Sequence, residues 1–113
     1  MEFTASETPD GKVVVVKTPH RLEAGISDDF RKMINELVDK GKTRLVIDMG
    51  ETDFMDSSGL GALVSRIAVT RAGQGDVRLA ALSPFILNLL KITHLDKVFY
   101  CFDDVASAIQ SFA

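Results

Sequence analysis

The strongest constraint on the fold of this chain is the alternation of strand-like and helix-like segments along it. Short runs of β-branched and apolar residues alternate with longer segments in which apolar residues recur at helical spacing. This alternation favours a sheet whose parallel neighbours are joined by right-handed crossovers. The first two strand-like runs are separated only by a short turn, so they add an antiparallel pair. We therefore predict an α/β domain with a mixed β-sheet flanked by helices and the element order ββαβαβαβα.

Turn residues and capping residues give these elements their expected bounds. Serine and aspartate are favoured helix caps, because a side-chain oxygen accepts a hydrogen bond from a free backbone N–H group. The helix that begins at Ser27 is expected to end at Gly41, and the helix that begins at Ser57 to run to about Ala72. The predicted strands cover residues 3–7, 13–17, 44–49, 77–82 and 98–102, and the two remaining helices start at Ser83-Pro84 and at Asp103.

Length and composition indicate one ordered domain over residues 1–113. The formal net charge is -3 and the basic residues are scattered, so direct binding of nucleic acid has no electrostatic support. No apolar stretch approaches the roughly 20 residues of a spanning helix, which argues against membrane insertion. The single cysteine, Cys101, lies in an apolar run and fits a reducing compartment. We expect a cytoplasmic protein.

The segment most informative about function is DSSGLG, at residues 56–61, which joins the strand at residues 44–49 to the second helix. It lies at the carboxyl edge of a strand, where ligands and partners usually dock in open α/β sheets. A capping serine explains one hydroxyl, but each of the two glycines costs up to roughly 1 kcal/mol relative to alanine in a helix. Such a helix start suggests close approach by another molecule. A phosphoryl group on Ser57 would suit the positive end of the helix dipole, and it would add about -1.5 to -2 charge beside Asp56 and Asp53.

Enzymatic and cofactor chemistry has weaker support in the sequence. A catalytic serine would need a base, and neither His20 nor His94 lies in a recognisable motif. The glycine that opens a nucleophile elbow is missing, and so are the Walker and dinucleotide fingerprints. His20, Glu23, Asp28 and Asp29 can be grouped into a metal site on paper. The two aspartates more simply complement a helix N-terminus, so we expect no catalytic residues, no metal and no cofactor.

The segment FMDSSGLG at residues 54–61, preceded by LVID at residues 45–48, resembles the phosphorylation segment of bacterial anti-sigma factor antagonists, the small STAS-domain proteins. The resemblance extends through residues 81–84 and 93–99, and the predicted element order fits it over essentially the whole chain. It implies a mixed sheet flanked by helices that presents a serine to an anti-sigma factor serine kinase. In that family the unmodified protein binds the kinase and frees the sigma factor, and a PP2C-type phosphatase reverses the modification.

The resemblance also assigns roles to single residues. The phosphorylated residue is the first serine after the aspartate, which is Ser57 here, and Ser58 is the fallback. Asp56 matches the family residue beside the acceptor, and the two glycines match residues that let the partner approach. The partner-binding residues implied in this way are Glu23, Asp56, Ser58, Gly59 and Gly61.

One segment, residues 18–25, departs from the family pattern. The family commonly has a glycine, then a leucine or isoleucine, then an aspartate shortly before the first helix. In this chain Glu23 stands roughly where that aspartate is expected, and the glycine is missing. Because this loop should lie near Ser57, the departure bears on which kinase is bound and how tightly.

A second function stays open beside the phosphorylation switch. The same fold can act as a constitutive STAS scaffold, or as an accessory subunit of a transporter ATPase or a sensory complex. In that case Ser57 would be a contact or a cap and would never be phosphorylated.

Overall fold

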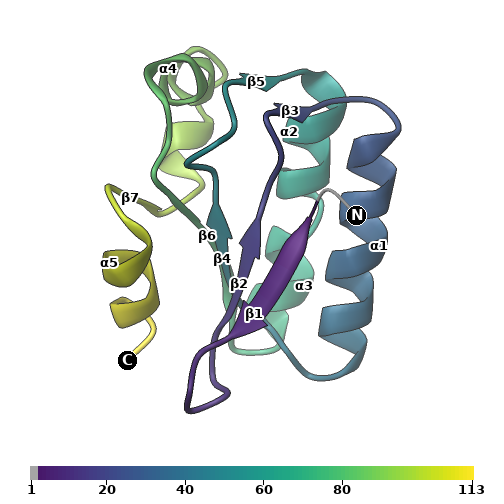
Figure 1. Cartoon of the computed structure of the whole chain (residues 1–113), viewed down its shortest axis with the longest axis vertical. Helices are drawn as coiled ribbons and strands as arrows, with labels where there is room; N and C mark the ends of the chain where they lie inside the picture. Colours follow the sequence, from purple (N-terminus) through teal and green to yellow (C-terminus); the bar gives the residue numbers. More distant parts are fainter. Residues whose placement is uncertain (1–2) are drawn as a thin grey trace.

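The computed structural model describes residues 3–113 and contains two β-sheets and a set of short helices (Figure 1). The main sheet has the strand order β1-β2-β4-β6-β7, and a second sheet pairs β3 with β5. The strands are β1 (Thr4–Glu7), β2 (Val14–Lys17), β3 (Arg21–Leu22), β4 (Arg44–Asp48), β5 (Phe54–Met55), β6 (Asp76–Ala80) and β7 (Cys101–Phe102). The helices are α1 (Ile26–Asp39), α2 (Ser57–Val64), α3 (Ile67–Ala72), α4 (Pro84–Ile92), the 3-10 helix η1 (Leu95–Lys97) and α5 (Val105–Gln110).

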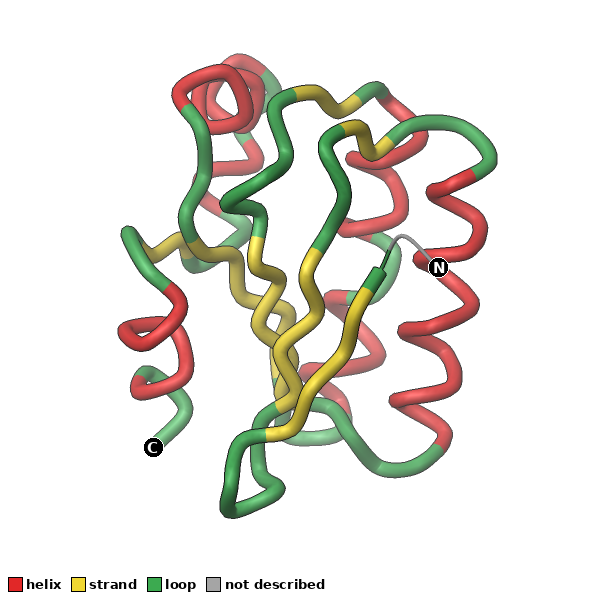
Figure 2. Tube along the Cα trace, in the orientation of Figure 1, coloured by secondary structure: helices red, strands yellow, loops and turns green. Residues whose placement is uncertain are grey.

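The main sheet is mixed, as the sequence predicts. β1 runs antiparallel to β2 in the predicted hairpin, whereas the pairs β2–β4, β4–β6 and β6–β7 are all parallel. Helices α1, α2 and α3 cover one face of this sheet, and α5 lies against the other (Figures 1 and 2). The helices therefore flank the sheet on both sides, which confirms the predicted fold class.

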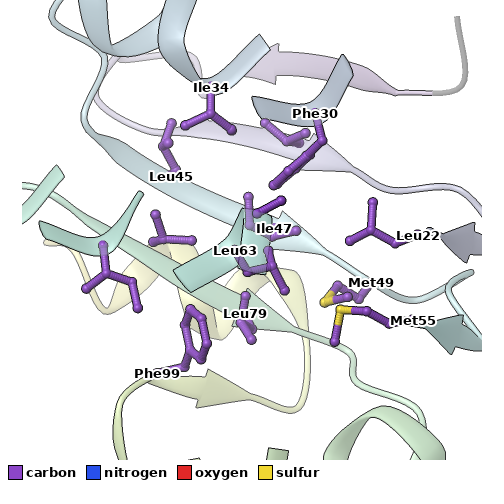
Figure 3. Packing of buried hydrophobic residues seen from close by; sticks show 14 of the residues in the cluster. Leu22, Phe30, Ile34, Leu45, Ile47, Met49, Met55, Leu63, Leu79 and Phe99 are labelled. Carbon is purple, nitrogen blue, oxygen red and sulfur yellow. The ribbon is translucent and has the colours of Figure 1, made fainter. Parts of the chain in front are cut away.

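The two faces of the sheet bury two separate apolar clusters. Along β4, Leu45 and Ile47 point into the larger cluster, where they meet Phe30 and Ile34 of α1 (Figure 3). The intervening Val46 belongs to the smaller cluster under α5. Alternate residues of a strand point to opposite faces, so a continuous apolar run such as that of β4 is what a strand buried on both faces requires.

The small sheet formed by β3 and β5 was not predicted. These two-residue strands run parallel and pair Arg21 with Phe54 and Leu22 with Met55. They lie beyond the carboxyl ends of β2 and β4 (Figure 1). Below this small sheet, the hydroxyl oxygens of Thr18 and Thr52 are 2.6 Å apart in a buried hydrogen bond that joins the two connecting segments.

Several predicted helix boundaries are confirmed and others are wrong. Ser83 accepts a hydrogen bond from Ile86 N and caps α4, with Pro84 in the first turn. The first helix, however, starts after Gly25 and contains Ser27, whose hydroxyl donates to the Glu23 carbonyl at 2.9 Å instead of capping. Ser27 is therefore the second residue of α1 and not its cap.

The predicted helix from Ser57 to Ala72 is broken into α2 and α3. The hydroxyl of Ser65 donates to the Ala62 carbonyl, and the helix ends at this residue before a new one begins at Ile67. Side-chain bonds from serine to the backbone compete with regular helix geometry. The break shows that the spacing of apolar residues alone overestimated the length of this helix.

The last predicted strand, residues 98–102, is shortened to Cys101–Phe102. The chain before it turns instead, because His94 adopts a left-handed conformation with φ of 62° and the 3-10 helix η1 follows. The terminal helix α5 is capped by Asp104, which accepts from Ser107 N at 2.7 Å, and not by Asp103.

Candidate functional site

The candidate site is the start of α2, beside the small sheet of β3 and β5. Asp56, not Ser57, caps the helix: its backbone is extended and its Oδ1 accepts hydrogen bonds from Ser58 N at 2.9 Å and Gly59 N at 3.0 Å. The Ser58 hydroxyl also donates to Oδ1, at 2.6 Å. This hydroxyl and then the Gly59 N–H hold the pKa of Asp56 below its ordinary value, so the carboxylate is ionised at neutral pH.

The two adjacent serines differ in how their hydroxyls are used. Ser58 is half-buried, and its Oγ lies 3.1 Å from Ser27 Oγ in addition to donating to Asp56. Ser57 is exposed, and none of the side-chain hydrogen bonds found within residues 3–113 involves its hydroxyl. The geometry thus leaves one hydroxyl at this helix start open to solvent and fixes the other.

The loop between β3 and α1 is held against the same carboxylate. Ala24 N donates to Asp56 Oδ2 at 3.3 Å, and Asp56 N donates to the Leu22 carbonyl at 3.3 Å. The Glu23 carboxylate forms an ion pair with Arg21 at 3.1 Å. The structure therefore brings Glu23 and Asp56, which are far apart in sequence, to one edge of the domain.

The two glycines of the segment have different surroundings. Gly59 is buried, and a Cβ placed on it would lie 2.3 Å from the Leu22 carbonyl oxygen and 2.9 Å from Met55 Cγ. A Cβ on Gly61 would lie 3.4 Å from the nearest atom outside its own helix, Nη2 of Arg31. Gly59 is thus required by the packing of α2 on β3, whereas Gly61 leaves room for an arginine of α1.

An aromatic and cationic stack adjoins the site and was missed by the sequence analysis. The Arg21 guanidinium carbon lies 4.2 Å from the centroid of the Phe54 ring, which stacks on Phe85 at 5.9 Å. Phe85 remains 49% exposed in the first turn of α4. A large aromatic residue directly after a Ser-Pro helix start was the signal available in the sequence, but its partner Phe54 became apparent only from the fold.

The remaining candidate residues do not converge on this site. His20 is exposed and takes part only through its carbonyl, which accepts from Asp53 N and Phe54 N at 3.0 and 3.2 Å. His94 follows α4, in the left-handed conformation. Within the described residues, no group of three or more His, Cys, Asp or Glu side chains is placed to hold a metal ion. Burial raises the pKa of the half-buried Cys101 thiol.

The helices over residues 3–113 include none long and apolar enough to cross a membrane.

Comparison with known proteins identifies relatives over nearly the whole chain. The family model described as the STAS domain matches residues 5–108. The anti-sigma F factor antagonist of Paenibacillus polymyxa is 26% identical over 98 residues, which cover 86% of this chain and 84% of that protein. A STAS-domain containing protein of Pseudomonas aeruginosa is 28% identical over 99 residues, with 88% and 97% covered.

The fold also matches that of a solved structure. The Bacillus cell fate determinant SpoIIAA, solved in its phosphorylated form, superposes with a TM-score of 0.78 at 21% identity, over 98% of this chain and 99% of that one. This likeness covers the entire architecture, from the N-terminal hairpin to the last helix.

Proposed function

Because this chain belongs to the STAS domain family, we propose that it is an anti-sigma factor antagonist controlled by phosphorylation of Ser57. In its unmodified form it binds an anti-sigma factor that is itself a serine kinase, and the sigma factor is released. Phosphorylation weakens this complex, and a PP2C-type phosphatase restores it. The chain itself supplies no catalytic group in this scheme.

The observation that carries the proposal is the difference between the two serine hydroxyls. A kinase needs an accessible hydroxyl that it can orient, and Ser57 offers one at the exposed start of α2. Phosphorylation of Ser58 would instead remove the 2.6 Å hydrogen bond to Asp56 and place a phosphoryl group against that carboxylate. Like charges at such a distance repel each other strongly. We therefore assign the modification to Ser57.

The expected effect of the phosphoryl group is electrostatic. Ser57 lies at the positive end of α2, which tolerates an anion, so the domain can accept the group without unfolding. The added charge of about -1.5 to -2 joins those of Asp56 and Asp53, which precede Ser57 closely in the chain. A partner surface complementary to a neutral hydroxyl would then meet a dense negative charge.

The other residues implied at the interface act in two ways in this proposal. Asp56, Ser58 and Gly59 fix the helix start, through the cap and the close contact with β3. Glu23 contributes a carboxylate on the neighbouring loop, where its ion pair with Arg21 sets its position. Gly61 carries no side chain, so the surface of α2 one turn after Ser57 does not project toward the partner.

The test combines phosphorylation with binding. The protein would be used as bait in lysate of its source organism with ATP, and the kinase recovered would be purified and assayed on wild type, Ser57→Ala and Ser58→Ala. We expect mass spectrometry to find phosphate on Ser57 in the wild type and in Ser58→Ala, and none in Ser57→Ala. Ser57→Asp should weaken binding of that kinase by more than a hundredfold, which corresponds to about 3 kcal/mol.

Two outcomes would count against the proposal. Phosphate on Ser58 in the wild type would reassign the acceptor. Recovery of a transporter ATPase or a sensory assembly, with Ser57 unmodified and Ser57→Asp binding as tightly as wild type, would instead support the constitutive scaffold.

A further inference from the structure

Arg31 of α1 is a half-exposed arginine that lies against the second turn of α2. Its Nη2 is 3.4 Å from the position that a Cβ of Gly61 would occupy. Its ion pair, with Asp28 one turn earlier in α1, spans 3.4 Å between two side chains that are 39% and 73% exposed. Exposed pairs of this kind contribute little to stability, so the guanidinium can exchange Asp28 for a stronger partner at small cost.

The position of Gly61 relates Arg31 to Ser57. Gly61 and Ser57 are four residues apart in α2, so they lie on the same side of this helix, with Cβ positions about 5–6 Å apart. Helical Cα–Cβ bonds tilt toward the N-terminus, and a Cβ at Gly61 therefore leans toward Ser57. Since Arg31 Nη2 lies 3.4 Å from that Cβ position, the guanidinium lies on the side of α2 that also carries Ser57.

We propose that Arg31 is the internal partner of the phosphoryl group on Ser57, an inference that rests on the phosphorylation proposed above. A phosphoryl group extends beyond the serine hydroxyl by a further layer of oxygens, toward the guanidinium one turn away. The planar fork of arginine donates two parallel hydrogen bonds to such oxygens, and these bonds are stronger than those of neutral groups. Phosphorylated Ser57 would thus draw Arg31 away from Asp28 and join the start of α2 to α1.

The neighbouring arginines are already committed to other groups. Arg21 stacks on Phe54 and pairs with Glu23. Arg66, at the far end of α2, donates to the Asn35 side chain of α1. Arg31 differs from both because it lies against a glycine of α2, which has no side chain with which to form a hydrogen bond.

This arrangement adds a second element to the switch. In the unmodified protein Arg31 presents a cation about one helical turn from Ser57, which an acidic group of the bound kinase can use. After phosphorylation the same cation is occupied by the phosphoryl group. The partner would then lose a favourable charge as well as meet an unfavourable one.

The experiment uses the full chain with phosphoserine installed at residue 57 during synthesis, so that it depends on no kinase. The pH titration of the phosphoserine is followed by phosphorus NMR in the otherwise wild-type protein, in Arg31→Gln and in Lys32→Gln. Lys32→Gln is the matched control, since it removes the same charge from the next, exposed residue of α1. A cation in contact with the phosphoryl group favours its dianionic form and lowers its second pKa.

We expect Arg31→Gln to move the titration midpoint upward clearly more than Lys32→Gln does. Equal midpoints in the two variants would overturn the assignment of Arg31. Thermal unfolding of the unphosphorylated variants provides the control for folding. Because the phosphoserine is introduced directly, this result is independent of whether a kinase modifies Ser57, and failure of either proposal is distinguishable from failure of the other.

Discussion

Replacing Gly59 by alanine tests how closely α2 approaches β3. The new Cβ would lie 2.3 Å from the Leu22 carbonyl oxygen, a backbone atom that cannot rotate away, and 2.9 Å from Met55 Cγ. The same carbonyl accepts the hydrogen bond from Asp56 N, so a shift of β3 would also disturb the helix cap. We expect Gly59→Ala to destabilise the domain.

The expected magnitude follows from two opposing terms. Overpacking a well-ordered site typically costs about 1–3 kcal/mol, and a contact with backbone puts Gly59 at the upper end. Alanine recovers up to about 1 kcal/mol through its higher helix propensity. The net loss is about 2 kcal/mol. For a chain of 113 residues this corresponds to a fall in Tm of about 8 °C, at roughly 4 °C per kcal/mol.

The matched control is Gly61→Ala, in the same helix two residues later. Its Cβ would make an ordinary contact at 3.4 Å with the end of a flexible arginine side chain. This variant should gain up to about 1 kcal/mol from helix propensity. Urea unfolding at pH 7 and calorimetry measure both changes. If Gly59→Ala were as stable as Gly61→Ala, the close approach of α2 to β3 would be refuted.

Two further substitutions test the capping of α2 by Asp56 and the pairing of the buried Asp76 carboxylate. Asp56→Ala should lower stability at neutral pH and make stability less dependent on acid pH. Hydrogen bonds lower the pKa of Asp56 in the folded state. The stability that this carboxylate contributes is therefore present above its unfolded-state pKa of about 3.9 and is lost as the pH falls through its folded-state pKa. Urea midpoints at pH 7 and pH 3 should thus differ less in the variant, and an unchanged difference would contradict this role. Arg78 donates to the buried Asp76 at 3.1 Å and to Ser111 O at 2.8 Å, and its guanidinium carbon lies 4.2 Å from the Phe112 ring centroid. Arg78→Ala should cost about 2–3 kcal/mol in urea unfolding, and a loss below about 0.5 kcal/mol would argue against it.

The parts of the fold that local chemistry decides were predictable. The hairpin between β1 and β2 follows from a turn containing Pro9 and Gly11, and the start of α4 follows from Ser83-Pro84. The small sheet was not predictable, because its two-residue strands carry no periodic pattern. β3 and β5 exist because segments about thirty residues apart in the chain are brought together by the main sheet.

The site shows the same division between local and long-range causes. The sequence placed a helix start at residues 56–58, but aspartate and serine are both good caps and the choice between them depends on neighbours. Asp56 takes the cap because its backbone N–H is also bound to β3 and its Oδ2 to the loop after β3. Only this tertiary context leaves Ser57 exposed. The two glycines likewise differ only in tertiary contacts, because Gly59 packs against β3 whereas Gly61 faces an arginine of α1.

The two-residue ladder of β3 and β5 has a consequence for dynamics. Few backbone hydrogen bonds hold this sheet, whereas β4 is paired on both sides along its length. Amide hydrogen exchange should therefore be slowest in β4 and faster at the helix start beside β5, through local opening that leaves the main sheet intact. Under the phosphorylation proposed for Ser57, a kinase could draw this segment into its own cleft for a local opening free energy well below that of global unfolding.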